Sequence, residues 1–317
     1  MAMVAEPPQR SATPSRTAAA PREQPASVVL SFDVEEHFRI EAAAALALDP
    51  RLKEHYCQRL EPSTRWLLDQ LERFDLQATF FVVGQIARRH ADLIRAMARA
   101  GHEVASHSWD HRRLHRLNPA AFREDLRQTR DALEQITGQP VRGYRAPTFS
   151  VVTQTAWAID VLADMDFAYD SSIFPVWHDR YGVPDAPRGP FRVRGSANEI
   201  LEIPPATMRL FGMNLPVGGG GYFRLLPLFL MQSVLDDVRS SCPDSVAMLY
   251  FHPWEFDPGQ ARLPLGRLSA WRTYVGIARS RPRLLNLLAG RRCARAIDVA
   301  KRLDRQWDVL PRFELGG

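Results

Sequence analysis

Short runs of apolar, β-branched residues alternate along this chain with segments of helical pattern. Residues 27–33 read SVVLSFD and residues 77–83 read QATFFVV. Such runs are typical of strands that are covered on both faces, as in parallel sheets. Between them, residues 64–74 read TRWLLDQLERF, with apolar residues at helical spacing after the N-cap candidates Ser63 and Thr64. We therefore expect a parallel α/β fold, open or barrel-like.

The same alternation continues beyond the second run. A helix is expected over residues 86–100, where the apolar residues share one face and Gly101 follows as a stop signal. Asn118 and Pro119 form a typical helix start, because a capping residue precedes a proline at the first helical position. Further strands are expected at residues 103–106, 141–144, 167–169 and 246–251.

The second half of the chain is less regular. Pro and Gly cluster between residues 174 and 221, which predicts a long irregular insertion beside the mouth of the site. After residue 258 the chain is rich in Arg and has helical patterning. We therefore expect one domain over residues 27–257 and a helical extension over residues 258–317 that packs on it. Residues 1–26 are rich in Pro, Ala, Ser and Arg, and we expect a disordered tail there.

The composition indicates a soluble protein. The tail lacks the apolar stretch of a secretory signal. The longest later apolar run, residues 225–231, is broken by Pro227 and falls short of the roughly 18 residues of a membrane span. Three cysteines share no CxxC spacing, which argues against a disulfide framework or a cysteine zinc site. We expect a cytoplasmic protein without an integral membrane segment, and peripheral contact with a lipid-linked substrate is compatible with these features.

The charge balance is mildly basic, with 41 Lys and Arg residues against 36 Asp and Glu residues and a net charge of +5. Lys occurs only at Lys53 and Lys301, so the excess is nearly all Arg, scattered without a dense basic run. Such scatter does not indicate a nucleic-acid partner. It fits a solvated surface with mild attraction to acidic polymers or lipid headgroups.

Two histidines follow the strand expected at residues 103–106. His107 and His111 lie in the sequence HSWDH. On a helical turn, side chains four residues apart project the same way, so both imidazoles could reach one metal ion. An isolated pair with this spacing arises easily by chance, and surface or core histidines are its more common meaning.

An acidic cluster follows the first strand. Asp33 and Glu35 lie two residues apart in DVEEH, so in an extended segment they point the same way. Ligands and catalytic groups of parallel α/β folds lie at this end of the strands. One carboxylate could be a base and the other a metal ligand. The alternative is a helix cap followed by acids that favour the helix dipole.

A late histidine, His252, follows the strand expected at residues 246–251 and precedes Pro-Trp-Glu. An imidazole at a strand end is well placed for proton transfer, although a buried histidine bonded to backbone is an ordinary alternative. Carboxylates, a histidine pair and a late histidine would thus converge at one end of the fold. Metal-assisted hydrolysis needs such a set: ligands, a base for water and an acid for the leaving group.

These motifs and their order resemble the polysaccharide deacetylase family, also called the NodB-homology or carbohydrate esterase family 4 fold. The resemblance runs from about residue 27 to residue 257 and includes all five family motifs: SFDVEE, HSWDH, the RAPT of residues 145–148, the DSS of residues 170–172 and MLYFH. DVEE, DSSIFP, the glycine run 218–221 with YFR, and FHPWEFDP further resemble a bacterial subgroup associated with exosortase and exopolysaccharide loci.

The resemblance implies a distorted (β/α) barrel and a metal-dependent hydrolase. Its expected activity is the removal of N-acetyl groups from an amino-sugar glycan or glycolipid precursor, in exopolysaccharide biosynthesis. The implied cofactor is a divalent metal, commonly zinc, and the implied partner is an N-acetylated saccharide. The family roles fall on these residues: Asp33 as catalytic base, His107 and His111 as metal ligands, Arg145 as the group that orients Asp33, His252 as general acid and Asp170 as a residue that steadies His252.

The chain departs from the family pattern at two places. The usual second Asp of the first motif is replaced by Val34, so the resemblance implies Glu35 as the third metal ligand, with Glu36 as the alternative. The usual aromatic residue after the Pro of the third motif is replaced by Thr148, whose neighbouring backbone N–H is expected to help hold the oxyanion.

Two tryptophans beside the predicted site residues remain open to two interpretations. Trp109 and Trp254 could stack on sugar faces, or they could belong to the core.

Two other functions remain open. An allantoinase-like or cyclic-imidase-like hydrolase would share the fold and act on a different C–N bond, and the HPWE and DVE sequences are compatible with it. A catalytically inactive sugar-binding module is disfavoured because Asp33, His107 and His252 are all present.

Overall fold

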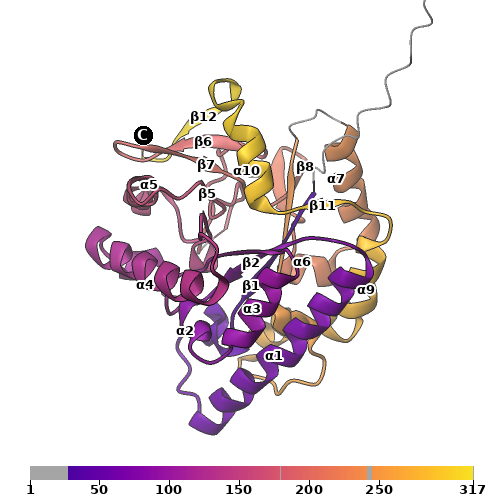
Figure 1. The fold of residues 1–317 in the computed structure, drawn as a ribbon. Coiled ribbons are helices and arrows are strands. Elements are labelled where there is room, and N and C mark those ends of the chain that lie inside the picture. Colours follow the sequence, from indigo (N-terminus) through magenta and orange to yellow (C-terminus); the bar gives the residue numbers. More distant parts are fainter. Residues whose placement is uncertain (1–27, 179, 241–244, 317) are drawn as a thin grey trace, which may run out of the picture.

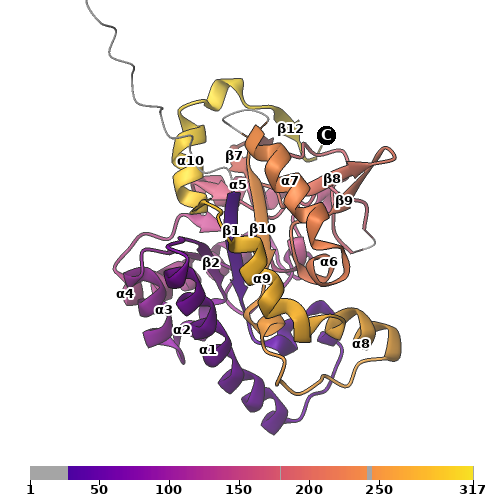
Figure 2. The ribbon, with the colours of Figure 1, turned by 90° about the vertical axis from the view of Figure 1, so that its right-hand side faces the viewer.

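The structure is a computed structural model that describes residues 28–178, 180–240 and 245–316. The tail predicted over residues 1–26 lies outside the described residues. A mostly parallel sheet forms the centre of the molecule, and helices pack around it (Figures 1 and 2).

Seven parallel strands form a distorted barrel, in the order β10, β1, β2, β3, β4, β5 and β7. Their bounds are Val28–Val34 for β1, Thr79–Val82 for β2, Glu103–Ser106 for β3, Gly143–Tyr144 for β4, Tyr169–Asp170 for β5, Glu199–Glu202 for β7 and Ala247–Phe251 for β10. Pro205, just beyond β7, forms a parallel bridge with Met248 of β10, and this bridge brings the two ends of the sheet together. The predicted α/β barrel is confirmed.

Helices cover the outside of the barrel, and α1 to α4 pack beside one another (Figure 1). The helices are α1 Pro50–Arg73, α2 Gly84–Ala87, α3 Ala91–Arg99, α4 Pro119–Thr137, α5 Trp157–Asp164, α6 Gly220–Leu225, α7 Leu228–Ser240, α8 Arg267–Tyr274, α9 Ser280–Leu288 and α10 Ala296–Asp304. Among the described helices, none has both the length and the apolarity that a membrane crossing requires.

The second half of the chain contributes more strands than its sequence pattern predicts. Within the segment 174–221, β6 (Phe191–Arg194) pairs antiparallel with β7, and β8 (Thr207–Leu210) forms a hairpin with β9 (Met213–Pro216). Beyond residue 258, β11 (Cys293–Ala294) pairs with β1, and β12 (Arg312–Glu314) pairs with β6. The segment expected to be irregular therefore supplies one strand of the barrel itself.

Two helices differ from the sequence prediction. α1 begins at Pro50, where the Asp49 side chain caps it by accepting a hydrogen bond from the Arg51 N–H at 2.7 Å. The expected caps Ser63 and Thr64 lie inside this helix, and their hydroxyls donate to the Leu60 carbonyl. The helix expected over residues 86–100 is interrupted between α2 and α3, because the backbone at His90 leaves the helical region.

The central strands are covered on both faces. All seven residues of β1 and all four of β2 are buried. Phe32 of β1 stacks on Phe80 of β2, with ring centroids 5.2 Å apart, and it also contacts Phe251 of β10. Burial on both faces explains the continuous apolar runs in the sequence. It also fixes the strand ends that carry the candidate site.

Candidate metal centre and active site

The carboxyl ends of the barrel strands bring the predicted site residues to one end of the molecule. Asp33 lies near the end of β1, and Glu35 follows directly. His107 follows β3, Arg145 follows β4 and His252 follows β10. These strands pair in parallel, so residues that follow their last positions lie at the same edge of the barrel.

Glu35, His107 and His111 form a compact set of ligand atoms. One carboxylate oxygen and one nitrogen of each imidazole all lie within 4.8 Å of one another. Nε2 of His111 is 2.5 Å from Oε2 of Glu35, and both side chains are at least nine-tenths buried. Two imidazoles and one carboxylate fit a divalent ion such as zinc, because zinc in catalytic sites takes three protein ligands and keeps a fourth position for water or substrate.

Hydrogen bonding and burial prepare these side chains to bind a cation. Nδ1 of His107 donates a hydrogen bond to the Arg145 carbonyl at 2.8 Å, which leaves the lone pair of Nε2 for a metal. Burial lowers the pKa of His107 to about 4, so this ring is neutral at pH 7. Burial opposes the ionised form of Glu35, but His111 and other neighbouring histidines outweigh this effect and hold the pKa of Glu35 well below its usual range.

Glu36 lies apart from the two imidazoles. It forms an ion pair with Arg39 at 2.5 Å, and the Cys57 thiol lies 3.7 Å from its other oxygen. Of the two carboxylates that the sequence left open, Glu35 is the one placed with His107 and His111.

Asp33 is held by Arg145. Nη1 of Arg145 donates to Oδ1 of Asp33 at 2.7 Å and also to Oγ of Ser31 at 2.9 Å. The guanidinium group is fully buried, packs over the Phe81 ring and donates twice more, to the carbonyl and hydroxyl of Ser171. This network leaves Oδ2 of Asp33 free to face the site.

His252 is held by two residues that the sequence analysis did not select. Nδ1 of His252 is hydrogen-bonded to Oε1 of Glu255 at 2.8 Å, and the other Glu255 oxygen is bonded to Arg224. Burial disfavours the imidazolium, but the hydrogen bond to Glu255 and the nearby carboxylates raise the pKa of His252 to about 9. Nε2 of His252 lies 3.7 Å from Glu35 and 3.9 Å from Asp33, so it faces the metal site.

The contact between Glu255 and His252 could have been predicted from the sequence, but the contact between Glu255 and Arg224 could not. Glu255 lies three residues after His252, on the short 3-10 helix Pro253–Phe256, and its carboxylate also accepts from the His252 backbone N–H. The spacing of HPWE could therefore have indicated a carboxylate that reaches back to the histidine. Arg224 lies 31 residues earlier, and no local pattern indicates its contact.

Two family models match different parts of this chain. Residues 24–168 match the family model described as polysaccharide deacetylase. This match covers somewhat less than half of the chain. Residues 171–301 match a second family model, described as a domain of unknown function (DUF3473).

Curated relatives match part of this chain. A peptidoglycan-N-acetylglucosamine deacetylase of Bacillus cereus is 26% identical over 95 residues, which cover 30% of this chain and 34% of that protein. A chitooligosaccharide deacetylase of Rhizobium leguminosarum bv. trifolii is 31% identical over 109 residues, which cover 31% of this chain and 51% of that protein. The match thus spans between a third and a half of the length of these relatives.

Solved structures show the deacetylase fold over nearly the whole chain. A structure described as a polysaccharide deacetylase from Mycobacterium smegmatis has a TM-score of 0.60 at 24% identity and covers 95% of this chain and 97% of that one. The structure of Puue allantoinase has a TM-score of 0.54 at 19% identity and covers 88% and 90% of the two chains. Both likenesses concern the fold alone.

The two matched segments share one barrel. The deacetylase segment supplies Asp33, Glu35 and the two histidines His107 and His111, whereas β7, β10 and His252 lie in the second segment. The side chains around the candidate metal centre therefore come from both segments.

Asp170 does not contact His252, contrary to the role expected for it. Its carboxylate accepts hydrogen bonds from the Ser171 backbone N–H at 2.9 Å and from the Ser172 hydroxyl. Burial, together with the charge of Asp170, raises the pKa of Glu202 well above its usual value, so Glu202 stays protonated and donates a hydrogen bond to Asp170. Asp170 therefore shapes the turn after β5, and Glu255 takes the position beside His252.

Thr148 lies on the wall of a cavity of about 260 Å³ that His111 also lines. Its backbone is left-handed, with φ 56° and ψ 28°, and His111 has a φ of 64°. Non-glycine residues in this conformation are strained and collect at functional sites. Thr148 and His111 thus line the same cavity, and the oxyanion role of this segment stays a prediction.

Trp109 and Trp254 differ in exposure, because Trp109 is partly exposed and lines a cavity of about 540 Å³ beside α2 and α4, whereas Trp254 is buried. The Trp109 ring packs against α2, where a side chain in place of Gly84 would meet it at 2.5 Å, and Arg88 covers its face. Trp254 is 8% exposed and stacks on the inner side of His252, with ring centroids 5.3 Å apart. The predicted sugar-stacking role stays a prediction for Trp109, whereas the burial of Trp254 favours the alternative of a packing group.

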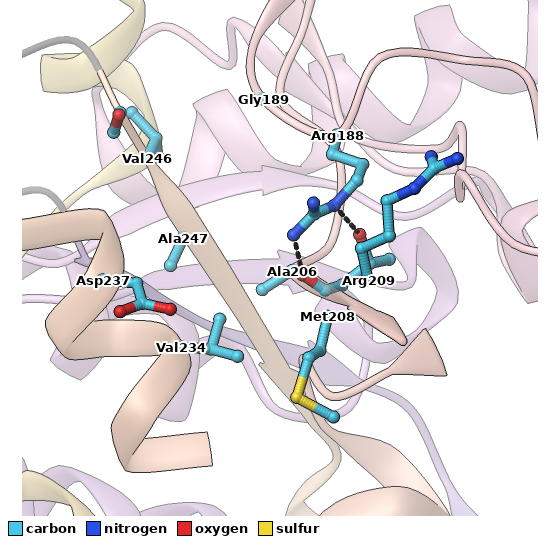
Figure 3. A pocket seen from close by; sticks show the side chains of 11 residues that line it. Arg188, Gly189, Ala206, Met208, Arg209, Val234, Asp237, Val246 and Ala247 are labelled. Carbon is cyan, nitrogen blue, oxygen red and sulfur yellow. Dashed lines mark hydrogen bonds between the residues drawn. The ribbon is translucent and has the colours of Figure 1, made fainter. Parts of the chain in front are cut away.

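A cavity of about 460 Å³, larger than the one that His111 lines, lies at the opposite end of β10 (Figure 3). Arg188, Met208 and Ala247 line it, and Arg188 is bonded to Thr207. None of the predicted site residues lines this cavity. The size of a cavity alone therefore does not locate the candidate active site.

Proposed function

We propose that this protein is a metal-dependent hydrolase that removes N-acetyl groups from an amino-sugar saccharide. The observation that carries the proposal is the convergence of Glu35, His107 and His111 with a carboxylate, Asp33, and a protonated imidazole, His252, at one barrel end. The match of residues 24–168 to the polysaccharide deacetylase model and the similarity to named deacetylases support the same reaction.

The residues divide the reaction between them. When bound, a divalent cation would acidify a water ligand and polarise the acetyl carbonyl. Oδ2 of Asp33 accepts the proton of the attacking water, while Arg145 holds the other oxygen in place. Water oxygen then bonds to the acetyl carbon, the C–N bond breaks, and Nε2 of His252 delivers its proton to the departing amine. The products are acetate and a free amino sugar.

The finer assignments extend the proposal. Zinc suits the two imidazoles and one carboxylate of the candidate centre. The backbone N–H beside Thr148 is the proposed oxyanion donor, because this loop borders His111. Motifs such as DVEE and FHPWEFDP support a role in exopolysaccharide biosynthesis.

We further propose action on the cytoplasmic side, on a lipid-linked saccharide. Cys57 and Cys293 are free thiols, which suits a reducing compartment. On α8, Leu268 and Trp271 are more than half exposed between arginines, a composition that suits a lipid headgroup region. Recovery of the protein from the periplasm on fractionation would contradict the first part, and failure to sediment with anionic vesicles would contradict the second.

Acetate release tests the main proposal. The zinc-loaded protein is expected to release acetate from N-acetylglucosamine oligomers and to leave small cyclic imides intact. Asp33→Asn should keep its metal and lose turnover by a factor of about 10² to 10⁴, the usual contribution of general base catalysis. Ring opening of imides without acetate release would instead favour the allantoinase-like alternative, whose fold this chain shares.

A further inference from the structure

The cavity beside His111 has a mixed lining. One wall comes from the segment after β1 and includes the apolar side chains Phe38 and Leu46. The other wall comes from residues 110–116, the loop that carries His111, and Thr148 closes the space between them. The cavity therefore adjoins the proposed site of acetyl hydrolysis and has room for a further part of the substrate.

Cations outnumber carboxylates in this lining. Its cationic side chains are Arg39, Lys53, Arg112, Arg113 and Arg116, and its carboxylates are Glu41 and Asp110. Arg112 is paired with Asp110 at 2.8 Å and Arg113 with Glu41 at 2.9 Å, while Arg39 is paired with Glu36 outside the cavity. These three guanidinium groups are neutralised and fixed in place.

Lys53 and Arg116 are the two cations left over. Both are exposed, and within the described part of the chain neither has a carboxylate partner. Nζ of Lys53 lies over the Phe38 ring, 5.9 Å from its centroid. An anion in the cavity would meet two uncompensated positive charges that belong to different segments, α1 and the loop after β3.

We propose that this cavity is a subsite for an anionic group, a carboxylate or a phosphate, carried by the saccharide next to the N-acetylated sugar. This inference rests on the proposed function and names the substrate class of that same site. The apolar wall packs against the sugar ring, and Lys53 and Arg116 contact the anionic group. A neutral oligomer fills the same space but brings no negative charge to Lys53 or Arg116.

Binding measured by calorimetry tests this subsite in the Asp33→Asn background, where hydrolysis is blocked. Three saccharide probes are compared on the zinc-loaded protein. They are a neutral N-acetylglucosamine tetramer, a tetrasaccharide of alternating glucuronic acid and N-acetylglucosamine, and an N-acetylglucosamine disaccharide 1-diphosphate. Two exposed ion pairs should tighten binding of an anionic probe by about tenfold at low ionic strength, and salt should weaken this preference. Comparison of the glucuronic acid probe with the diphosphate probe shows whether the subsite prefers a carboxylate or a phosphate.

Matched variants locate the effect. Lys53→Gln with Arg116→Gln should remove the tenfold preference and leave binding of the neutral tetramer unchanged. Lys301→Gln with Arg305→Gln removes the same charge from exposed positions in and directly after α10 and should keep the preference. Equal affinity for neutral and anionic probes, or a preference that survives in the first double variant, would overturn the subsite. Absence of acetate release by the wild-type protein would overturn the proposed function instead.

Discussion

Glu255 is the residue on which the charge of His252 depends. Its two oxygens join the imidazole on one side and Arg224 on the other, and the carboxylate is completely buried. A carboxylate in this position fixes the ring so that Nε2 points at the site and keeps it protonated. Glu255 is thus a positioning residue for the proposed general acid.

Glu255→Gln is expected to lower kcat by about 10- to 100-fold, the usual cost of losing a partner that orients a site residue. The loss should grow as pH rises, because His252 loses its proton at a lower pH without the carboxylate. Metal content should stay at the wild-type level, since Glu255 is outside the triad. Kinetics across pH 6 to 9 check this, with thermal unfolding to confirm that the variant folds. If kcat of Glu255→Gln depended on pH as kcat of the wild type does, Glu255 would not control the protonation of His252.

His102 makes folding stability depend on pH. Burial, with the nearby Arg295 charge, lowers its pKa to about 4, and its Nδ1 accepts a hydrogen bond from the Ala78 backbone N–H. In the unfolded chain the His102 imidazole takes up a proton near pH 6.5, whereas in the native chain it does so only near pH 4. The stabilisation that neutral His102 contributes is therefore present above pH 6.5 and is lost as pH falls toward 4.

Urea unfolding at pH 7 and pH 4.5 should therefore show a larger loss of stability in the wild type than in His102→Asn, with a difference of up to about 3 kcal/mol. The loss for each protein is the difference between its own free energies of unfolding at the two pH values, so the pH-independent cost of the substitution cancels. Equal losses in the two proteins would show that His102 does not carry this dependence.

At the residue scale, the site residues that could be predicted from the sequence are those that lie at the ends of buried strands. Asp33, His107 and His252 each follow a recognisable buried strand, so their meeting at one barrel end follows from topology. The pairing of Glu255 with Arg224 depends on how the segment after the glycine run folds back. Likewise the direction of the Trp109 ring depends on its packing against α2.

At the element scale, continuous burial made the central strands predictable. β1, β2, β3 and β10 are buried throughout, and the sequence predicted them to within a few residues of their ends. β6 was missed because it is short and alternates apolar and charged residues among prolines and glycines. The start of α1 was missed because residues 50–63 are polar and contain Pro62.

The true start of α1 can be tested by its caps. Asp49→Ala should destabilise the protein by about 1 kcal/mol, because it removes the acceptor for the Arg51 N–H. Ser63→Ala should cost much less, since Ser63 lies inside the helix and its hydroxyl only bonds back to its own helix. Urea unfolding of both variants measures the difference. The reverse order would place the helix start at residue 63, as the sequence pattern suggested.

At the scale of the whole molecule, the barrel unites the two matched segments. β1 pairs with β2 of the deacetylase segment on one side and with β10 of the second segment on the other. The bridge between Pro205 and Met248 lies wholly in the second segment and closes the ring. Because His252 follows β10, the proposed acid and the proposed metal ligands meet only when both segments fold together.

The most direct measurement of this account is the metal content of the purified protein and of two matched variants. The wild type is expected to bind about one zinc ion per chain, Glu35→Gln to lose it, and Glu36→Gln to keep it, because only Glu35 lies with His107 and His111. A Glu36→Gln variant without metal beside a fully loaded Glu35→Gln variant would contradict the account.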